Sequence, residues 1–176
     1  MIFEETPLSG AYVVLPEVVR DERGFFARSW CSREFESRGL NPALVQCNIS
    51  YNDKKGTLRG MHFQLPPHEE AKLVRCVRGS IFDVIIDLRP DSPTYCRWQG
   101  VELNEENRKA LYIPEGFAHG FLTLTDDTEV LYQMSSWFVP DSAAGIRWDD
   151  PAIAIDWPDE PRCVSKKDRG YPDFVI

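Results

Sequence analysis

Short runs of alternating apolar residues, each ended by turn-forming residues, constrain the fold of this chain more than any other feature. Examples are LVRCVRG (73–79), HGFLTLTDD (119–127) and TEVLYQMSSWF (128–138). Bulky apolar residues at every second position are typical of strands that bury one face. Gly, Pro, Asp and Asn recur between these runs at roughly the 8-to-12-residue spacing of a sandwich or jelly-roll barrel. The pattern predicts an all-β protein.

Three segments depart from this simple alternation. The run IFDVIIDL (81–88) is almost continuously apolar, which predicts a strand in a central position. The spacing in CSREFESRGL predicts a short peripheral helix within 31–40, ended by Gly39. From about residue 140 the chain is rich in Pro and Asp, which predicts an irregular C-terminal arm over 140–176. With no repeat and no low-complexity linker, residues 1–176 are expected to form a single domain.

The charge balance restricts the partners. With 28 acidic and 20 basic residues, the net charge of -8 argues against nucleic-acid binding and against anionic membranes. No apolar run approaches the roughly 20 residues that cross a bilayer, and the acidic start MIFEETPLSG does not resemble a signal peptide. Five scattered cysteines, never spaced C-x-x-C, make disulfides and zinc knuckles unexpected. We expect a cytoplasmic protein.

One segment, 56–79, concentrates groups suited to chemistry. It holds two of the three histidines and several basic residues, which could together focus an anionic small molecule despite the acidic balance. The residues are His62, His68, Arg59, Lys72, Arg75 and Arg78.

The register of LRGMHFQ (58–64) poses a geometric problem. In a regular strand His62 and Gln64 share one face, while Arg59 lies on the other. If His62 faces a barrel interior, Arg59 must reach the cavity from the beginning of the strand, or a bulge must intervene. On the residues alone, His62 and Tyr132 would more often be packed core side chains than catalytic groups.

The motifs identify a resemblance that runs through nearly the whole chain. LRGMHFQ, KLVRCVRG, DVIIDLR and IPEGFAHGF occur in this order, with DERGFF and QCNIS before them and GIRWDDP and SKKD after them. In these motifs the sequence closely resembles the dTDP-4-dehydrorhamnose 3,5-epimerase family. The resemblance implies a cupin-type jelly-roll barrel, a homodimer that exchanges strands, and no cofactor.

The resemblance also implies a mechanism. A carbon next to a ketone is acidic, so an epimerase needs a base on one face of the sugar, an acid on the other and a donor at the enolate oxygen. Matching the family motifs makes His62 the base, Tyr132 the acid, Asp168 the partner that orients His62, and Lys72 the donor. The implied substrate is a nucleotide-linked 4-keto-6-deoxy sugar, of the dTDP-4-dehydro-6-deoxyglucose type.

Further positions match residues that hold the nucleotide diphosphate and the sugar. Arginine suits a diphosphate because its planar fork can donate two hydrogen bonds to one phosphate. These positions are Arg23, Gln46, Asn48, Arg59, His119 and Lys167, and Arg28 belongs to the same set.

Several of these positions depart from the family pattern. The family usually has glutamate at the positions of Arg28 and Ala143, and often glutamine at that of Glu70. It also has a tyrosine pair near Trp137 and Phe138. These departures raise the hypotheses of a different nucleotide or sugar, and of a mono-epimerase acting at C3 or C5 alone.

A function of another class stays open at this point. Many cupins bind a transition metal through an H-x-H pair, a glutamate and a later histidine. Here the pair reads His62-Phe63-Gln64, so no metal site is expected. A metal-dependent cupin and a non-catalytic sugar-nucleotide-binding cupin are the alternatives to an epimerase.

Overall fold

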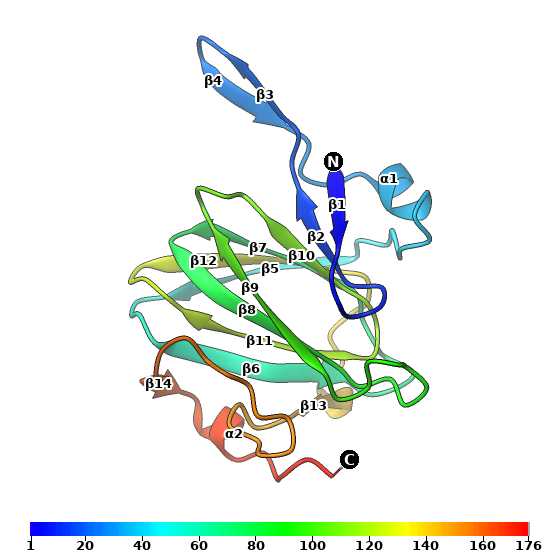
Figure 1. The fold of residues 1–176 in the computed structure, drawn as a ribbon, viewed down its shortest axis with the longest axis vertical. Coiled ribbons are helices and arrows are strands. Elements are labelled where there is room, and N and C mark those ends of the chain that lie inside the picture. The colour runs from blue at the N-terminus through cyan, green and yellow to red at the C-terminus, as the bar shows by residue number, and fades with distance from the viewer. Residues whose placement is uncertain (176) are drawn as a thin grey trace.

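A computed structural model describes residues 1–175 and has two facing β-sheets as its body (Figure 1). Every strand pair in the first sheet is antiparallel. In order across that sheet, its strands are β1 (Ile2–Glu5), β2 (Tyr12–Leu15), β10 (Ala110–Ile113), β7 (Lys72–Arg78), β12 (Thr128–Met134) and β5 (Gln46–Asn52).

The second sheet is antiparallel except at one edge, where β14 (Cys163–Val164) pairs in parallel with β6 (Thr57–Gln64). Apolar side chains from both sheets meet between them, which confirms the predicted all-β jelly-roll barrel. The strands in order are β13 (Ala143–Gly145), β6, β11 (Phe117–Thr123), β8 (Ser80–Asp87) and β9 (Trp98–Asn104).

The position of strand β8 in the sheet explains why its sequence is almost continuously apolar. It lies between β11 and β9, and its two faces belong to different cores. Ile81 and Ile85 pack inside the barrel, whereas Val84 and Ile86 pack against the C-terminal segment outside it. All four are completely buried, so the prediction of a central strand is confirmed.

The predicted helix is present but shorter than the segment proposed for it. Helix α1 covers Ser32–Glu36 and buries Phe35 against the outer face of the first sheet. Gly39, at φ +70°, supplies the left-handed turn that ends it. Just before this helix, β3 (Val18–Asp21) and β4 (Gly24–Ala27) form a separate hairpin that extends away from the barrel (Figure 1).

The C-terminal arm contains short elements between irregular stretches. A 3-10 turn, η1 (Pro140–Ser142), leads into β13, and both β13 and β14 pair with β6. A single helical turn, α2 (Lys166–Arg169), follows and lies beside β6 (Figure 1). Among residues 1–175, no helix is long and apolar enough to cross a bilayer.

A bulge in β6 resolves the register problem of LRGMHFQ. His62 pairs with His119 and Arg59 pairs with Phe121, so β6 carries one more residue than β11 over this interval. Gly60 occupies the bulge at φ +142°, and a Cβ there would lie 2.5 Å from the Cα of Gly120. Because of the extra residue, Arg59 and His62 both line the same cavity.

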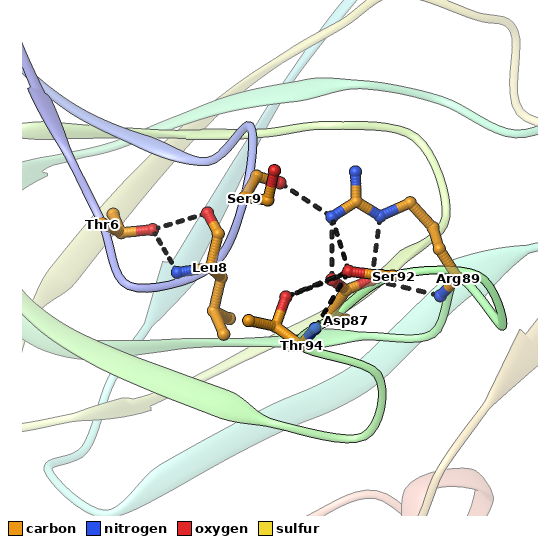
Figure 2. Close-up of polar contacts among 7 residues, drawn as sticks. All are labelled: Thr6, Leu8, Ser9, Asp87, Arg89, Ser92 and Thr94. Carbon is orange, nitrogen blue, oxygen red and sulfur yellow. Dashed lines mark hydrogen bonds and ion pairs between the residues drawn. The ribbon is translucent and has the colours of Figure 1, made fainter.

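A polar cluster near the end of β8 connects the turn that follows this strand to the loop that contains Ser9 (Figure 2). The buried Asp87 carboxylate accepts hydrogen bonds from Arg89, Ser92 and Thr94. The Arg89 guanidinium also donates to the carbonyl of Ser9 at 2.7 Å. Burial alone would raise the pKa of Asp87, but these hydrogen bonds outweigh burial and lower it to about 2. The motif DVIIDLR, which supplies Asp87 and Arg89, therefore has a structural explanation here.

Candidate active site

A cavity of about 580 Å³ opens between the two sheets, within the range of about 300–1,000 Å³ that small-molecule sites occupy. Strands β5, β7 and β12 form one wall, and β6, β11 and the C-terminal arm form the other. Most of the side chains proposed from the sequence gather here. They are Asn48, Arg59, His62, Lys72, His119, Tyr132, Lys167 and Asp168.

The imidazole of His62 is held by the carboxylate of Asp168. The distance from His62 Nε2 to Asp168 Oδ1 is 2.7 Å, and the backbone N–H of Gly60 approaches Asp168 Oδ2 at 3.5 Å. Burial would raise the pKa of Asp168, but the hydrogen bond and charge of His62 outweigh it and lower that pKa. The carboxylate is therefore ionised and accepts from Nε2, which leaves Nδ1 as the basic nitrogen of a neutral His62.

Tyr132 lies on the opposite wall from His62. It belongs to β12, and its hydroxyl lies 3.1 Å from Ser50 Oγ. Burial raises the pKa of Tyr132 above its ordinary value, although the hydrogen bond to Ser50 opposes the shift. The phenol is therefore neutral near pH 7 and carries a proton that it can donate.

A second imidazole–carboxylate pair lies close to Tyr132. His119 Nε2 is 2.7 Å from Asp83 Oδ1, and both side chains are almost completely buried. The His119 and Tyr132 rings meet edge to face, with centroids 6.2 Å apart. The other carboxylate oxygen of Asp83 is buried without a hydrogen-bond partner among the described residues. This pair fixes the imidazole that forms the wall beside the phenol.

Two cations that line the cavity with His62, Arg59 and Lys72, are both held by neighbours. Arg59 Nε donates to Asn52 Oδ1 at 2.7 Å, which anchors the guanidinium to β5. Lys72 Nζ lies 2.9 Å from Glu70 Oε1, and both of these side chains are buried. The cavity therefore offers a guanidinium and an ammonium whose positions are set by fixed acceptors.

Three residues of the predicted set lie outside this cavity. Arg23 is at the tip of the β3–β4 hairpin, where its exposed side chain pairs with Asp21. Arg28 donates to Glu34 of α1 at 2.6 Å. Gln46 lies next to the cavity and reaches it indirectly, because its amide donates to Asn48 Oδ1 at 3.2 Å. Within one chain, Arg23 and Arg28 do not join the other side chains.

The chain matches the family model described as dTDP-4-dehydrorhamnose 3,5-epimerase over residues 5–175. It belongs to this family. The epimerase of Methanothermobacter thermautotrophicus is 47% identical over 172 residues, which cover 96% of this chain and 92% of the relative. The protein is thus an isomerase of the carbohydrate epimerase class.

Solved structures of relatives agree over almost the full length. The dTDP-4-dehydrorhamnose 3,5-epimerase of Elizabethkingia anophelis has a TM-score of 0.96 at 38% identity, covering 99% of this chain and 96% of the other. The Bacillus anthracis enzyme, solved with TDP and PPi bound, has a TM-score of 0.94 at 40% identity, covering 98% and 99%. The epimerase described here therefore has the family's jelly-roll fold.

Sequence reasoning on this epimerase left several contributors unassigned, among them Asp83 and Ser165. Asp83 could have been found from periodicity, since it is a carboxylate at an inward position between Ile81 and Ile85. Ser165 caps α2 by accepting from the Asp168 backbone N–H at 3.0 Å, and the pattern S-x-x-D indicates such a turn. Among residues 1–175, no group of three or more His, Cys, Asp and Glu side chains is placed to hold a metal ion.

Proposed function

We propose that this epimerase acts on a nucleotide-diphosphate-linked 4-keto-6-deoxy sugar, as in the conversion of dTDP-4-dehydro-6-deoxyglucose to dTDP-4-dehydrorhamnose. The observation that carries the proposal is the placement of His62, with its carboxylate partner, and Tyr132 on opposite walls of one cavity. A sugar ring between them would present one face to a base and the other to an acid. The names of the relatives supply the substrate class.

The proposed first step is proton removal by His62. Nδ1 takes the proton from the carbon next to the C4 ketone, and the electron pair of that C–H bond moves into an enolate with its charge on the C4 oxygen. Asp168 stabilises the resulting imidazolium through the 2.7 Å contact. Lys72, at the cavity wall, would donate to the enolate oxygen.

In the proposed second step Tyr132 donates its proton to the same carbon from the opposite face. The configuration inverts, leaving an imidazolium on one wall and a phenolate on the other, and exchange with solvent resets both groups. Arg59 and Lys167 line the same cavity and would bind the diphosphate, with Asn48 and His119 holding neighbouring parts of the substrate.

The test of this function is solvent deuterium exchange at the sugar, followed by NMR. Wild-type protein should incorporate deuterium next to the ketone, and His62→Ala should lower the rate by at least about 10³-fold, as removal of a catalytic base does. Exchange at wild-type rate in His62→Ala would refute the base assignment.

The same experiment separates the two reaction outcomes. Two labelled carbons indicate 3,5-epimerisation, which we propose, and one indicates a mono-epimerase.

Calorimetric titration with dTDP, UDP, CDP and GDP tests the base of the nucleotide. We expect dTDP to bind most tightly, and a clear preference for another nucleotide would support the alternative raised by Arg28 and Ala143.

We also propose a homodimer built by exchange of the β3–β4 hairpin. The hairpin exposes large apolar side chains to solvent, with Val19 at 67% and Phe26 at 78% exposure, which is unusual for a monomer. The edge strand β5 likewise exposes Ile49 at 68% and could pair with an added strand. Exchange would carry Arg23 and Arg28 toward the cavity of a second copy, where their predicted role could be fulfilled.

Light scattering after size exclusion tests this assembly. A mass of two chains is expected, and Phe26→Asp should shift it toward one chain because a charge would be buried at the interface. A wild-type protein that elutes as a monomer would contradict the proposal.

The cytoplasmic location also stays a prediction, supported by five cysteines that are all free thiols.

A further inference from the structure

The amide of Gln64 connects two parts of the cavity that are far apart in sequence. Gln64 is the last residue of β6, it lines the cavity, and only 5% of it is exposed. Its Nε2 shares two N–H donors among three acceptors, the Glu70 carboxylate, the His68 carbonyl at 2.7 Å and the Trp137 carbonyl at 3.1 Å. Its Oε1 accepts from the backbone N–H of Val139 at 2.6 Å. A buried side chain with this many partners fixes the relative positions of all of them.

The first connection leads to the ammonium of Lys72. Glu70 Oε2 accepts from Gln64, while Glu70 Oε1 lies 2.9 Å from Lys72 Nζ. The Glu70 side chain is only 4% exposed, so it has little freedom to turn toward water. The direction in which Lys72 points into the cavity is therefore set by a chain of contacts that starts at Gln64.

The second connection leads to the rim of the cavity. We call residues 137–139 the rim segment, because Phe138 both lines the cavity and is 52% exposed. Gln64 holds the two outer residues of this segment by their backbone groups, and Gln46 accepts from the N–H of Phe138 at 3.2 Å. A segment outside regular strands is thus anchored by amide side chains on two strands.

We propose that Gln64 is a positioning residue that fixes both the Lys72 ammonium and the rim segment through one amide group. The part concerning Lys72 rests on the proposed function, in which that ammonium donates to the enolate oxygen. The part concerning the rim segment rests only on the nucleotide-binding part of that proposal and not on the proton-transfer steps.

The donor–acceptor arrangement suggests a reciprocal exchange as the test. In Gln64→Glu, residue 64 cannot donate and places a carboxylate against that of Glu70, whereas it can still accept from Val139. In the double variant Gln64→Glu/Glu70→Gln, the new amide at 70 can donate to 64 and accept from Lys72. The contact with Lys72 is then restored, but the carbonyl of Trp137 still lacks its donor.

The measurements are kcat and KM for epimerisation, dTDP binding by calorimetry and the melting temperature. Gln64→Glu should lower kcat at least about ten-fold and weaken dTDP binding at least about five-fold. The double variant should recover kcat to within about three-fold of wild type while dTDP binding stays weak. Gln99→Glu, the same change on β9 outside the cavity, should alter neither quantity.

Several outcomes would overturn the inference. Wild-type kcat and dTDP binding in Gln64→Glu would do so, as would a double variant whose kcat is no better than that of the single one. If Gln64→Glu does not fold, Gln64→Met, which removes the hydrogen bonds without adding charge, must show both losses. A wild-type protein that binds dTDP but exchanges no deuterium would refute the proposed function, and dTDP binding by Gln64→Met would still decide the rim segment.

Discussion

His62 and Tyr132 line one cavity from opposite sheets, His62 on β6 and Tyr132 on β12. Each side chain is fixed by a partner on its own side, Asp168 for the imidazole and Ser50 for the phenol. The cavity that they line has a volume of about 580 Å³, and we propose that a sugar ring lies between the two groups. Inversion at carbon needs this separation of base and acid.

Replacing Tyr132 by Phe tests whether Tyr132 donates the proton after His62 has removed one. We expect epimerisation to fall about 10²–10⁴-fold because the proposed acid is lost. Deuterium exchange with retention of configuration should persist, since His62 can remove a proton and return one on the same face. NMR of the sugar in D₂O distinguishes the two processes. Equal loss of exchange and inversion would show that Tyr132 is needed for proton removal too.

Replacing Asp168 by Asn tests the orientation of the base. An amide at 168 cannot stabilise the imidazolium and can stabilise the wrong tautomer of His62, so kcat should fall about 10³-fold with little change in dTDP binding. Single-turnover kinetics and calorimetry measure the two effects separately. A variant with wild-type kcat would remove Asp168 from the mechanism.

The same variant should also change how stability depends on pH. The pKa of Asp168 is lowered in the folded protein. Its contribution to stability is therefore present above the unfolded-state value of about 3.9 and is lost as pH falls through the folded-state value. Between neutral pH and pH 3, wild type should lose more unfolding free energy than Asp168→Asn does, as measured by urea titration.

Replacing Gly60 by Ala tests the bulge that brings Arg59 to the cavity. The new Cβ would lie 2.5 Å from the Cα of Gly120, at a φ of +142°. We expect a destabilisation of about 2–4 kcal/mol, from backbone strain together with overpacking, and loss of activity. Gly39→Ala is the matched control, because φ is +70° there and no atom lies within 4 Å of the added methyl. A Gly60→Ala protein no less stable than the control would contradict this account.

Replacing Asp87 by Asn tests the polar cluster of Figure 2, which lies outside the cavity. Loss of the buried charge partner of Arg89 should cost about 3 kcal/mol, which corresponds to a drop of about 6–12 °C in Tm for a chain of this size. The kcat of the folded variant should not change. Thermal melts at pH 7 measure the effect, with the exposed Asp91→Asn as control.

The pH dependence of this cluster has a definite sign. The pKa of Asp87 is about 2 in the folded protein and about 3.9 when unfolded. The carboxylate therefore contributes stability that is complete above pH 4–5, roughly, and is lost as pH falls toward about 2. Acid titration of wild type should show this loss, and Asp87→Asn should lack it.

The sequence by itself determined the strand content and the burial of particular strands. Alternation is a local property of a pleated chain, so runs such as LVRCVRG report which side faces the core without any knowledge of their neighbours. The continuous apolar run in β8 predicted a central position, and the structure shows both of its faces buried. The motifs of the sequence were specific enough to indicate the family. The family resemblance in turn indicated the candidate catalytic residues, which are His62, Tyr132, Lys72 and Asp168.

Only the tertiary structure decided which of those residues meet. Arg59 and His62 share a cavity because the bulge gives β6 one more residue than β11. The position of such a bulge is set by the pairing between the two strands. Asp168 reaches His62 across 106 positions of sequence because β14 pairs with β6 and leads into α2. Gln64, Glu70 and the rim segment converge for a similar reason. Contacts of this kind depend on the summed packing of distant segments, whereas periodicity depends only on neighbours in the chain.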